Sequence, residues 1–155
     1  MSESTTSKID KLFAMIERSG ISSLTEWEPF WFAIFWPFRE VDNGGFHTFF
    51  FNDAGQFAID ALAGLQEVGA HKSADILRRA INVFPEGKVP TDQQLRRLVL
   101  TSLPDESQWK RLGDLSNEFF ASNEDVTGLI DRFVAQNPAD FPTFLDFGDK
   151  NFPVR

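Results

Sequence analysis

The sequence predicts an all-α protein, a single-domain compact helical bundle around a central aromatic helix, with an extended C-terminal arm. Apolar residues recur at helical spacing along most of the 155-residue chain. The segment from Trp27 to Asn52 is rich in Phe and Trp and lacks the period-two alternation of a half-buried strand. A helix that is apolar on all sides cannot face water, so we expect this segment at the centre, with other helices packed around it.

The central helix is expected from residue 28 to residue 42. Thr25 and Glu28 have the spacing of a capping box, which would start it. The apolar run from Phe30 to Trp36 is also compatible with a buried strand, but the length of the segment favours a helix. Pro37 lacks a backbone donor and clashes with the preceding turn, which predicts a kink at that position.

The string Asp42-Asn43-Gly44-Gly45 is expected to end this helix, with Asn43 or Gly44 in a left-handed conformation. A type I′ hairpin turn at Asn43-Gly44 is the alternative, although no alternating strands flank it. The following residues then form a short helix or turn. The structural residues of this block are Asn43, Gly44, Gly45, Phe46, Phe49, Phe50 and Asn52.

Periodic apolar faces predict further helices before and after the aromatic segment. The first has its apolar face at residues 9–16 and ends at Gly20. The inner faces of the later helices are expected at Ala58, Ala61, Leu62, Leu65 and Val68; at Ala74, Leu77, Ala80, Ile81 and Phe84; at Leu95, Leu98, Val99 and Ser102; at Trp109, Leu112, Phe119 and Phe120; and at Val126, Leu129, Ile130 and Phe133.

Turn and cap residues separate these helices. Gly69-Ala70 is so short a connection that the two helices beside it should be antiparallel neighbours. Thr91 and Gln94 form a second capping box, and Asn123 is expected to cap the last helix, which Asn137-Pro138 ends. We expect residues 1–7 to be disordered, residues 138–155 to form the extended arm, and residues 1–155 to form a single domain.

The composition restricts the class of protein. The chain has no Cys, which excludes disulfide scaffolds, thiolate metal sites and Cys nucleophiles and fits a cytoplasmic location. Residues 1–20 lack the basic and apolar regions of a secretory signal, and no apolar run is long enough to span a membrane.

The net charge is −8, from 15 Lys and Arg against 23 Asp and Glu. This balance argues against direct binding of nucleic acid, whose phosphates a protein must neutralise, and it favours a basic protein partner. The acids concentrate in residues 21–60 and 101–155, each with a net charge of −5, whereas residues 61–100 carry +2.

No set of residues predicts catalysis or a metal site. His47 and His71 do not stand at zinc or di-iron spacing with carboxylates. His47 lies among Phe residues, which favours a partly buried ring with local hydrogen bonds over a catalytic role. No Ser stands in a GxSxG turn, and the isolated glycines do not form a phosphate loop. We therefore expect a protein that is not an enzyme and takes no cofactor.

Carboxylates are the one type of predicted surface residue whose number suggests a binding function. Asp114 and Glu118 stand four residues apart on one predicted helix face. Repulsion between two like charges at this spacing destabilises a helix by roughly a few tenths of a kcal/mol, unless a partner protein binds both carboxylates. Carboxylates are also favoured at helix N-termini, which is the alternative explanation for Asp105, Glu124 and Asp125. The candidate partner-binding residues are Asp105, Glu106, Asp114, Glu118, Glu124 and Asp125.

The aromatic segment resembles a block of a bacterial DNA-mimic protein family, E-V-x-N-G-G-F-x-Q-[FY]-[FY]-x-N. The similar string here is Val41-Asp42-Asn43-Gly44-Gly45-Phe46-His47-Thr48-Phe49-Phe50-Phe51-Asn52. The family's later turn and helix end are similar to Gly69-Ala70-His71-Lys72 and Phe84-Pro85. The resemblance covers residues 27–92, and Asp42 and Thr48 depart from the family's usual residues.

The resemblance implies an acidic, all-α homodimer that presents carboxylates in place of phosphates to a basic DNA-binding protein, such as a helix-turn-helix repressor. Because the matching block is aromatic, it supports the fold more strongly than the function. Duplex DNA carries about one charge per 1.7 Å, so a chain of −8 matches only about 14 Å of duplex and two copies match about 27 Å.

Two other functions are compatible with the residues. The first is an immunity or antitoxin-like protein that neutralises a basic toxin through the same carboxylates. The second is a small-ligand-binding or enzymatic helical domain that uses the aromatic middle as a pocket, which would require a sizeable cavity beside His47.

Overall fold

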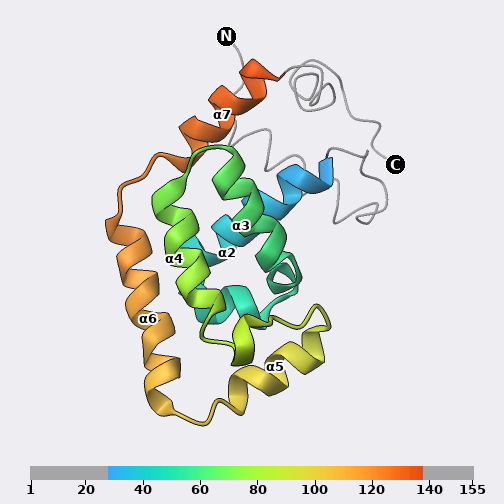
Figure 1. Cartoon of the computed structure of the whole chain (residues 1–155), viewed down its shortest axis with the longest axis vertical. Helices are drawn as coiled ribbons and strands as arrows, with labels where there is room; N and C mark the ends of the chain where they lie inside the picture. The colour runs from blue at the N-terminus through green and yellow to red at the C-terminus, as the bar shows by residue number, and fades with distance from the viewer. Residues whose placement is uncertain (1–27, 138–155) are drawn as a thin grey trace. The chain divides into compact units, whose positions relative to one another are not determined.

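The computed structural model describes residues 28–137, which form α-helices and short 3-10 helices without a strand (Figure 1). They fall into two compact units, with residues 33–126 in the larger and residues 28–32 and 127–137 in the smaller. The all-α class is confirmed, and the single domain over 1–155 stays a prediction. The disorder at 1–7, the helix at 9–16 and the arm at 138–155 lie outside the described residues.

Helix α2 spans Glu28–Phe51, and the predicted capping box at Thr25 lies outside the described residues. The helix continues through Pro37, and the residue with non-helical dihedral angles is Gly45, with φ 76° and ψ −173°. The first helical stretch therefore breaks within residues 42–45, as predicted, and a short second stretch continues from there to Phe51. The left-handed residue is Gly45, not Asn43 or Gly44, because only glycine adopts this combination of angles readily. Helix on both sides also excludes the hairpin turn.

The next two helices pack side by side, as the sequence predicts (Figure 1). The 3-10 helix η2 (Asp53–Phe57) leads into α3 (Ala58–Glu67), and α4 (His71–Ile81) follows after Gly69. Gly69 has φ 85°, so it allows the sharp reversal that a residue with a side chain would resist. The predicted inner faces of both helices are buried, except that Leu62 is half-buried.

Helix α5 (Gln93–Thr101), which follows the 3-10 helix η3 (Pro85–Gly87), faces inward with residues other than the predicted ones. Leu95 and Leu98 are 50% and 61% exposed, whereas Arg96 and Leu100 are buried. The N-cap is also one residue later than predicted, because the carboxylate of Asp92 and not Thr91 accepts the Leu95 N–H at 2.8 Å.

Helix α6 (Glu106–Ala121) lies along α4 (Figure 1). Its predicted inner residues Leu112 and Phe119 are buried, but Trp109 and Phe120 are 41% and 47% exposed, so the predicted apolar face is too wide. Asn123 has φ 54° between the end of α6 and the start of α7. Helix α7 (Val126–Gln136) ends before Asn137, as predicted.

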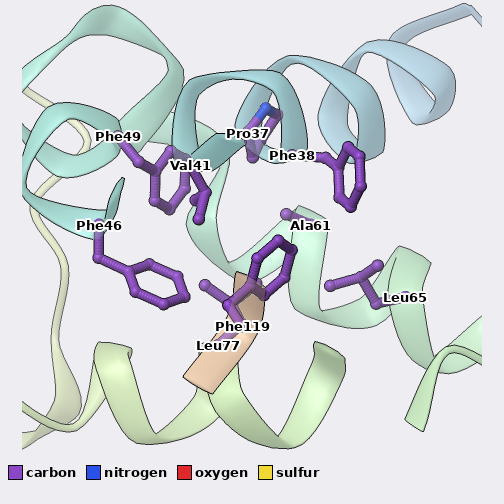
Figure 2. Close-up of a pocket in the computed structure, with 9 residues that line it drawn as sticks. All are labelled: Pro37, Phe38, Val41, Phe46, Phe49, Ala61, Leu65, Leu77 and Phe119. Atoms are coloured by element: carbon purple, nitrogen blue, oxygen red, sulfur yellow. The ribbon is translucent and has the colours of Figure 1, made fainter. Parts of the chain in front are cut away.

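The core of the larger unit is aromatic and tightly packed. Figure 2 shows side chains of α2, α3, α4 and α6 pointing toward one another around an apolar pocket. The volume of this pocket is about 20 Å³, little more than one water molecule requires. The residues that line it are Pro37, Phe38, Val41, Phe46, Phe49, Ala61, Leu65, Leu77 and Phe119.

Candidate functional site

The interruption of α2 at Gly45 connects this helix to α6. The Phe46 N–H donates to the Ser116 hydroxyl at 2.9 Å, and that hydroxyl donates to the Leu112 carbonyl at 2.7 Å. Phe46 and Ser116 are buried, so water does not reach this N–H. The Ser116 hydroxyl therefore satisfies a backbone donor at the point where the helix is interrupted.

The other residues of the aromatic block also serve the fold. The Thr48 hydroxyl donates to the Gly44 carbonyl at 3.0 Å, and the Asn52 side chain donates to the Glu40 carboxylate at 2.9 Å. Asn43 is exposed. The rings of Phe46, Phe49 and Phe50 are at most 1% exposed, and they contact one another and the rings of Phe84 and Phe119.

Arg96 is the one charged side chain buried in the described core, and sequence reasoning missed it. Its guanidinium donates to backbone carbonyls alone: to Phe50 and Asn52 at 2.6 Å each, and to Pro90 and Thr91 at 3.0 Å each. Burial lowers the pKa of Arg96, although the nearby charge of Asp53 opposes this shift. Arg96 thus fixes the end of α2 to the loop before α5.

Two neighbouring residues complete this arrangement. The Arg97 Nε–H donates to the Phe51 carbonyl at 2.8 Å, and its guanidinium lies 4.3 Å from the centre of the Phe51 ring. A Cβ on Gly55 would lie 2.5 Å from Arg96 Nε and 2.9 Å from two backbone carbonyls. Position 55 therefore requires glycine for the buried guanidinium to fit.

The candidate acids at the start of α6 include a helix cap. The Asp105 carboxylate accepts the Ser107 N–H at 2.9 Å, and hydrogen bonds from Ser107 hold the pKa of Asp105 below its ordinary value. Glu106 and Asp114 are exposed, but Lys110 stands midway between them at four-residue spacing. The exposed side of α6 therefore alternates in sign instead of presenting acids alone.

Glu118 is paired across to α4. Its carboxylate accepts two hydrogen bonds from the Arg79 guanidinium, one of them at 2.9 Å, while Arg79 also donates to Asp75 at 3.0 Å. The hydrogen bonds from Arg79 lower the pKa of Glu118, and the charges of Arg79 and Arg111 act in the same direction. This candidate is therefore partly neutralised by the protein itself.

The Glu118 pair predicts a pH dependence with a definite sign. Because its folded pKa is lowered, Glu118 stabilises the fold at pH values above its unfolded pKa, and this contribution is lost as the pH falls through the folded pKa. NMR titration of the carboxyl carbon should show a midpoint below that of an ordinary Glu, and Arg79→Gln should raise it. Arg78→Gln, which removes a neighbouring charge, should leave it nearly unchanged; equal effects of the two variants would contradict the pairing.

Glu124 and Asp125 lie between α6 and α7. The Glu124 carboxylate accepts the backbone N–H groups of Lys72 and Ser73 at 3.1 and 2.8 Å, so it closes the N-terminus of α4 from 51 residues further along the chain. Asp125 is exposed. Five of the six candidates, all but Asp125, are thus divided among two helix caps, one ion pair and an alternating helix face.

A second group of carboxylates has fewer internal partners. Residues 40–70 contain five acids and no Lys or Arg, and none of the five forms an ion pair within the described residues. Asp60 and Glu67 lie on the exposed side of α3, about 10 Å apart along its axis. The five acids are Glu40, Asp42, Asp53, Asp60 and Glu67. A count of the net charge of each predicted helix would have identified this group from the sequence.

His47 has local contacts, as its Phe-rich surroundings indicate. Its Nε2–H donates to the Trp109 carbonyl at 2.9 Å, and the two rings lie 4.3 Å apart. The apolar pocket of Figure 2 is not lined by His47, and its volume of about 20 Å³ is far below the several hundred Å³ of typical ligand sites. The geometry does not favour the small-ligand alternative.

The model of a protein family described as DMP19-like protein matches residues 22–137. The chain belongs to the DMP19-like protein family. This is a DNA-mimic family, so the family expected from the aromatic block is confirmed. Comparison with curated proteins and with solved structures finds no match to the chain.

The DMP19-like match extends well beyond the aromatic block. It includes every described residue, from the start of α2 to the end of α7. Both groups of carboxylates and the buried Arg96 therefore lie within the family region. Within this DMP19-like region, no described helix is both long and apolar enough to cross a membrane, and no three described His, Asp or Glu residues form a metal-binding group.

Proposed function

We propose that this DMP19-like protein is a non-catalytic DNA mimic that occupies the DNA-binding surface of a basic protein, such as a helix-turn-helix repressor, and so competes with DNA. The observation that carries the proposal is membership of a DNA-mimic family together with a net charge of −8. Such a partner has a surface built to neutralise phosphates, and carboxylates offer it the same sign of charge.

The α3 side of the protein supports this proposal better than α6. Asp60 and Glu67 are exposed without a positive neighbour on their helix, and their separation of about 10 Å corresponds to about three phosphate steps along one DNA strand. Glu106 and Asp114 would contribute at α6, where Lys110 reduces their effect. Two copies would double the charge to about that of 27 Å of duplex, which suits a two-fold repressor that reads half-sites about 34 Å apart.

The proposal is tested by competition on operator DNA. Each helix-turn-helix repressor of the host is bound to its fluorescently labelled operator, and the purified protein is added at increasing concentration. Release of at least one repressor is expected, and release should weaken as the salt concentration rises, because the attraction is screened. If no repressor leaves its operator at low salt, or if release is indifferent to salt, the proposal fails.

The location of the contact surface follows from two variants of equal charge. Asp60→Asn/Glu67→Gln and Glu106→Gln/Asp114→Asn each remove two negative charges from exposed helix faces and keep the shape of the side chains. We expect the α3 variant to weaken binding of the released repressor by about tenfold or more and the α6 variant by about threefold or less. Calorimetric titration measures both, and the reverse order would assign the contact to α6.

A further inference from the structure

A polar cleft lies between the end of α4 and the first half of α6. It is lined by Arg79, Asn82 and Val83 on one side and by Gln108 and Arg111 on the other. Its volume is about 200 Å³, far larger than the apolar pocket of about 20 Å³. Since roughly 10–15 Å³ is enough to hold one water molecule, the cleft has room for a small ligand.

Two arginines line the cleft, although the chain as a whole is acidic and the carboxylates of Asp75 and Glu118 lie beside Arg79. The exposed side of α4 carries Lys72, Arg78 and Arg79 against the single carboxylate of Asp75. Arg79 already pairs with Asp75 and Glu118. The exposed Arg111 side chain, in contrast, has no hydrogen bond or ion pair within residues 28–137. Its charge acts on Glu118, but its N–H groups remain available for hydrogen bonds to an anion in the cleft.

Gln108 adds an acceptor to these donors. Its Oε1 atom is buried, and it has no hydrogen-bond partner within the described part of the chain. A buried acceptor without a donor costs roughly 1–3 kcal/mol, so a rotation of the Gln108 amide that turns Oε1 toward an O–H group of a ligand in the cleft removes that penalty. The cleft thus combines donors for an oxyanion with an acceptor for a hydroxyl.

We propose that this cleft is a binding site for a small phosphate. Arg111, with support from Arg79, donates to the phosphate oxygens, because guanidinium groups match the geometry of oxyanions. Gln108 Oε1 accepts a hydrogen bond from a hydroxyl, which hydrogen phosphate carries itself and which a phosphate monoester can carry on its alcohol. Sulfate offers the same oxygens without a hydroxyl, so the site should distinguish the two anions.

The test is an NMR titration of the full chain with inorganic phosphate, with sodium sulfate and with glycerol 3-phosphate, each at constant ionic strength. We expect saturable shifts at the cleft residues with phosphate and binding about tenfold weaker with sulfate. Tighter binding of glycerol 3-phosphate than of inorganic phosphate would identify a monoester as the ligand, and weaker binding would identify free phosphate.

Matched variants distinguish binding in the cleft from non-specific attraction of phosphate to positive charge on the surface. Arg111→Gln should weaken phosphate binding by about tenfold or more, and Gln108→Leu should remove most of the preference over sulfate. Lys110→Gln removes the same charge from the adjacent exposed residue and should change binding by about twofold or less. The proposal is overturned by an absence of saturable shifts, by equal binding of sulfate, or by equal losses in the Lys110 and Arg111 variants.

Discussion

Replacement of Arg96 by Met is expected to lower the free energy of unfolding by roughly 3–5 kcal/mol. Met keeps an unbranched stem but has no donor, so the carbonyls of Phe50, Asn52, Pro90 and Thr91 lose the guanidinium. The side chain is 0% exposed, so water cannot replace these hydrogen bonds without opening the packing. Urea unfolding followed by circular dichroism measures the loss.

The adjacent arginine provides the control. Arg97 also donates to the end of α2, but it makes one hydrogen bond, to the Phe51 carbonyl, from a half-exposed position. We expect Arg97→Met to cost about 1 kcal/mol, the combined contribution of that bond and of the contact with the Phe51 ring. If the Arg96 variant loses no more stability than the Arg97 variant, the buried guanidinium does not hold α2 in place.

Helices with largely apolar inner faces are the ones that the sequence predicts correctly. In α3 and α4 the spacing of Ala and Leu residues identifies the buried side, and Gly69 identifies the turn between them. The physical reason is that burial of apolar surface drives these contacts, and residue type alone reveals it. Nothing beyond local spacing is needed to place such helices against each other.

Helix α5 has an orientation that the sequence predicts wrongly, because a charged residue occupies its inner face. Apolar spacing assigns Leu95 and Leu98 to the core, whereas Arg96 takes that place and the two Leu are exposed. The acceptors that compensate its burial include the carbonyls of Phe50 and Asn52, which lie 46 and 44 residues earlier in the chain. Partners so distant leave no trace in a local pattern.

The candidate site is predicted incompletely for a similar reason. A sequence shows where carboxylates are but not which cation or N–H they meet after folding. Glu118 meets Arg79, which is 39 residues away, and Glu124 meets the start of α4. Asp60 and Glu67 have no such partner among residues 28–137, and they stand too far apart in the sequence to be noticed as a cluster. An acid on the surface of the chain becomes a candidate for a partner only when the fold leaves it unpaired.

Replacement of Gly45 by Ala is expected to lower the free energy of unfolding by roughly 2–4 kcal/mol. Two costs combine at this position. The backbone angles, φ 76° and ψ −173°, lie in a region that is essentially restricted to glycine. A Cβ would also lie 2.7 Å from the Ser116 hydroxyl, which is buried and holds the Phe46 N–H. Relieving this contact would break the bond between α2 and α6.

Two other glycines distinguish the cost of backbone strain from the cost of the contact with Ser116. Gly69 has φ 85°, but a Cβ added there would meet no atom within 4 Å, so Gly69→Ala should cost about 1 kcal/mol, from backbone strain alone. Gly113 lies inside α6, where a Cβ would have its nearest neighbour at 3.8 Å, so Gly113→Ala should stabilise by up to about 1 kcal/mol. Denaturant unfolding of the three variants should therefore give losses in the order Gly45, Gly69, Gly113, with the last of opposite sign. A loss at Gly45 no larger than at Gly69 would show that Ser116 yields freely, and the hydrogen bond to Phe46 would then contribute little to holding α2 on α6.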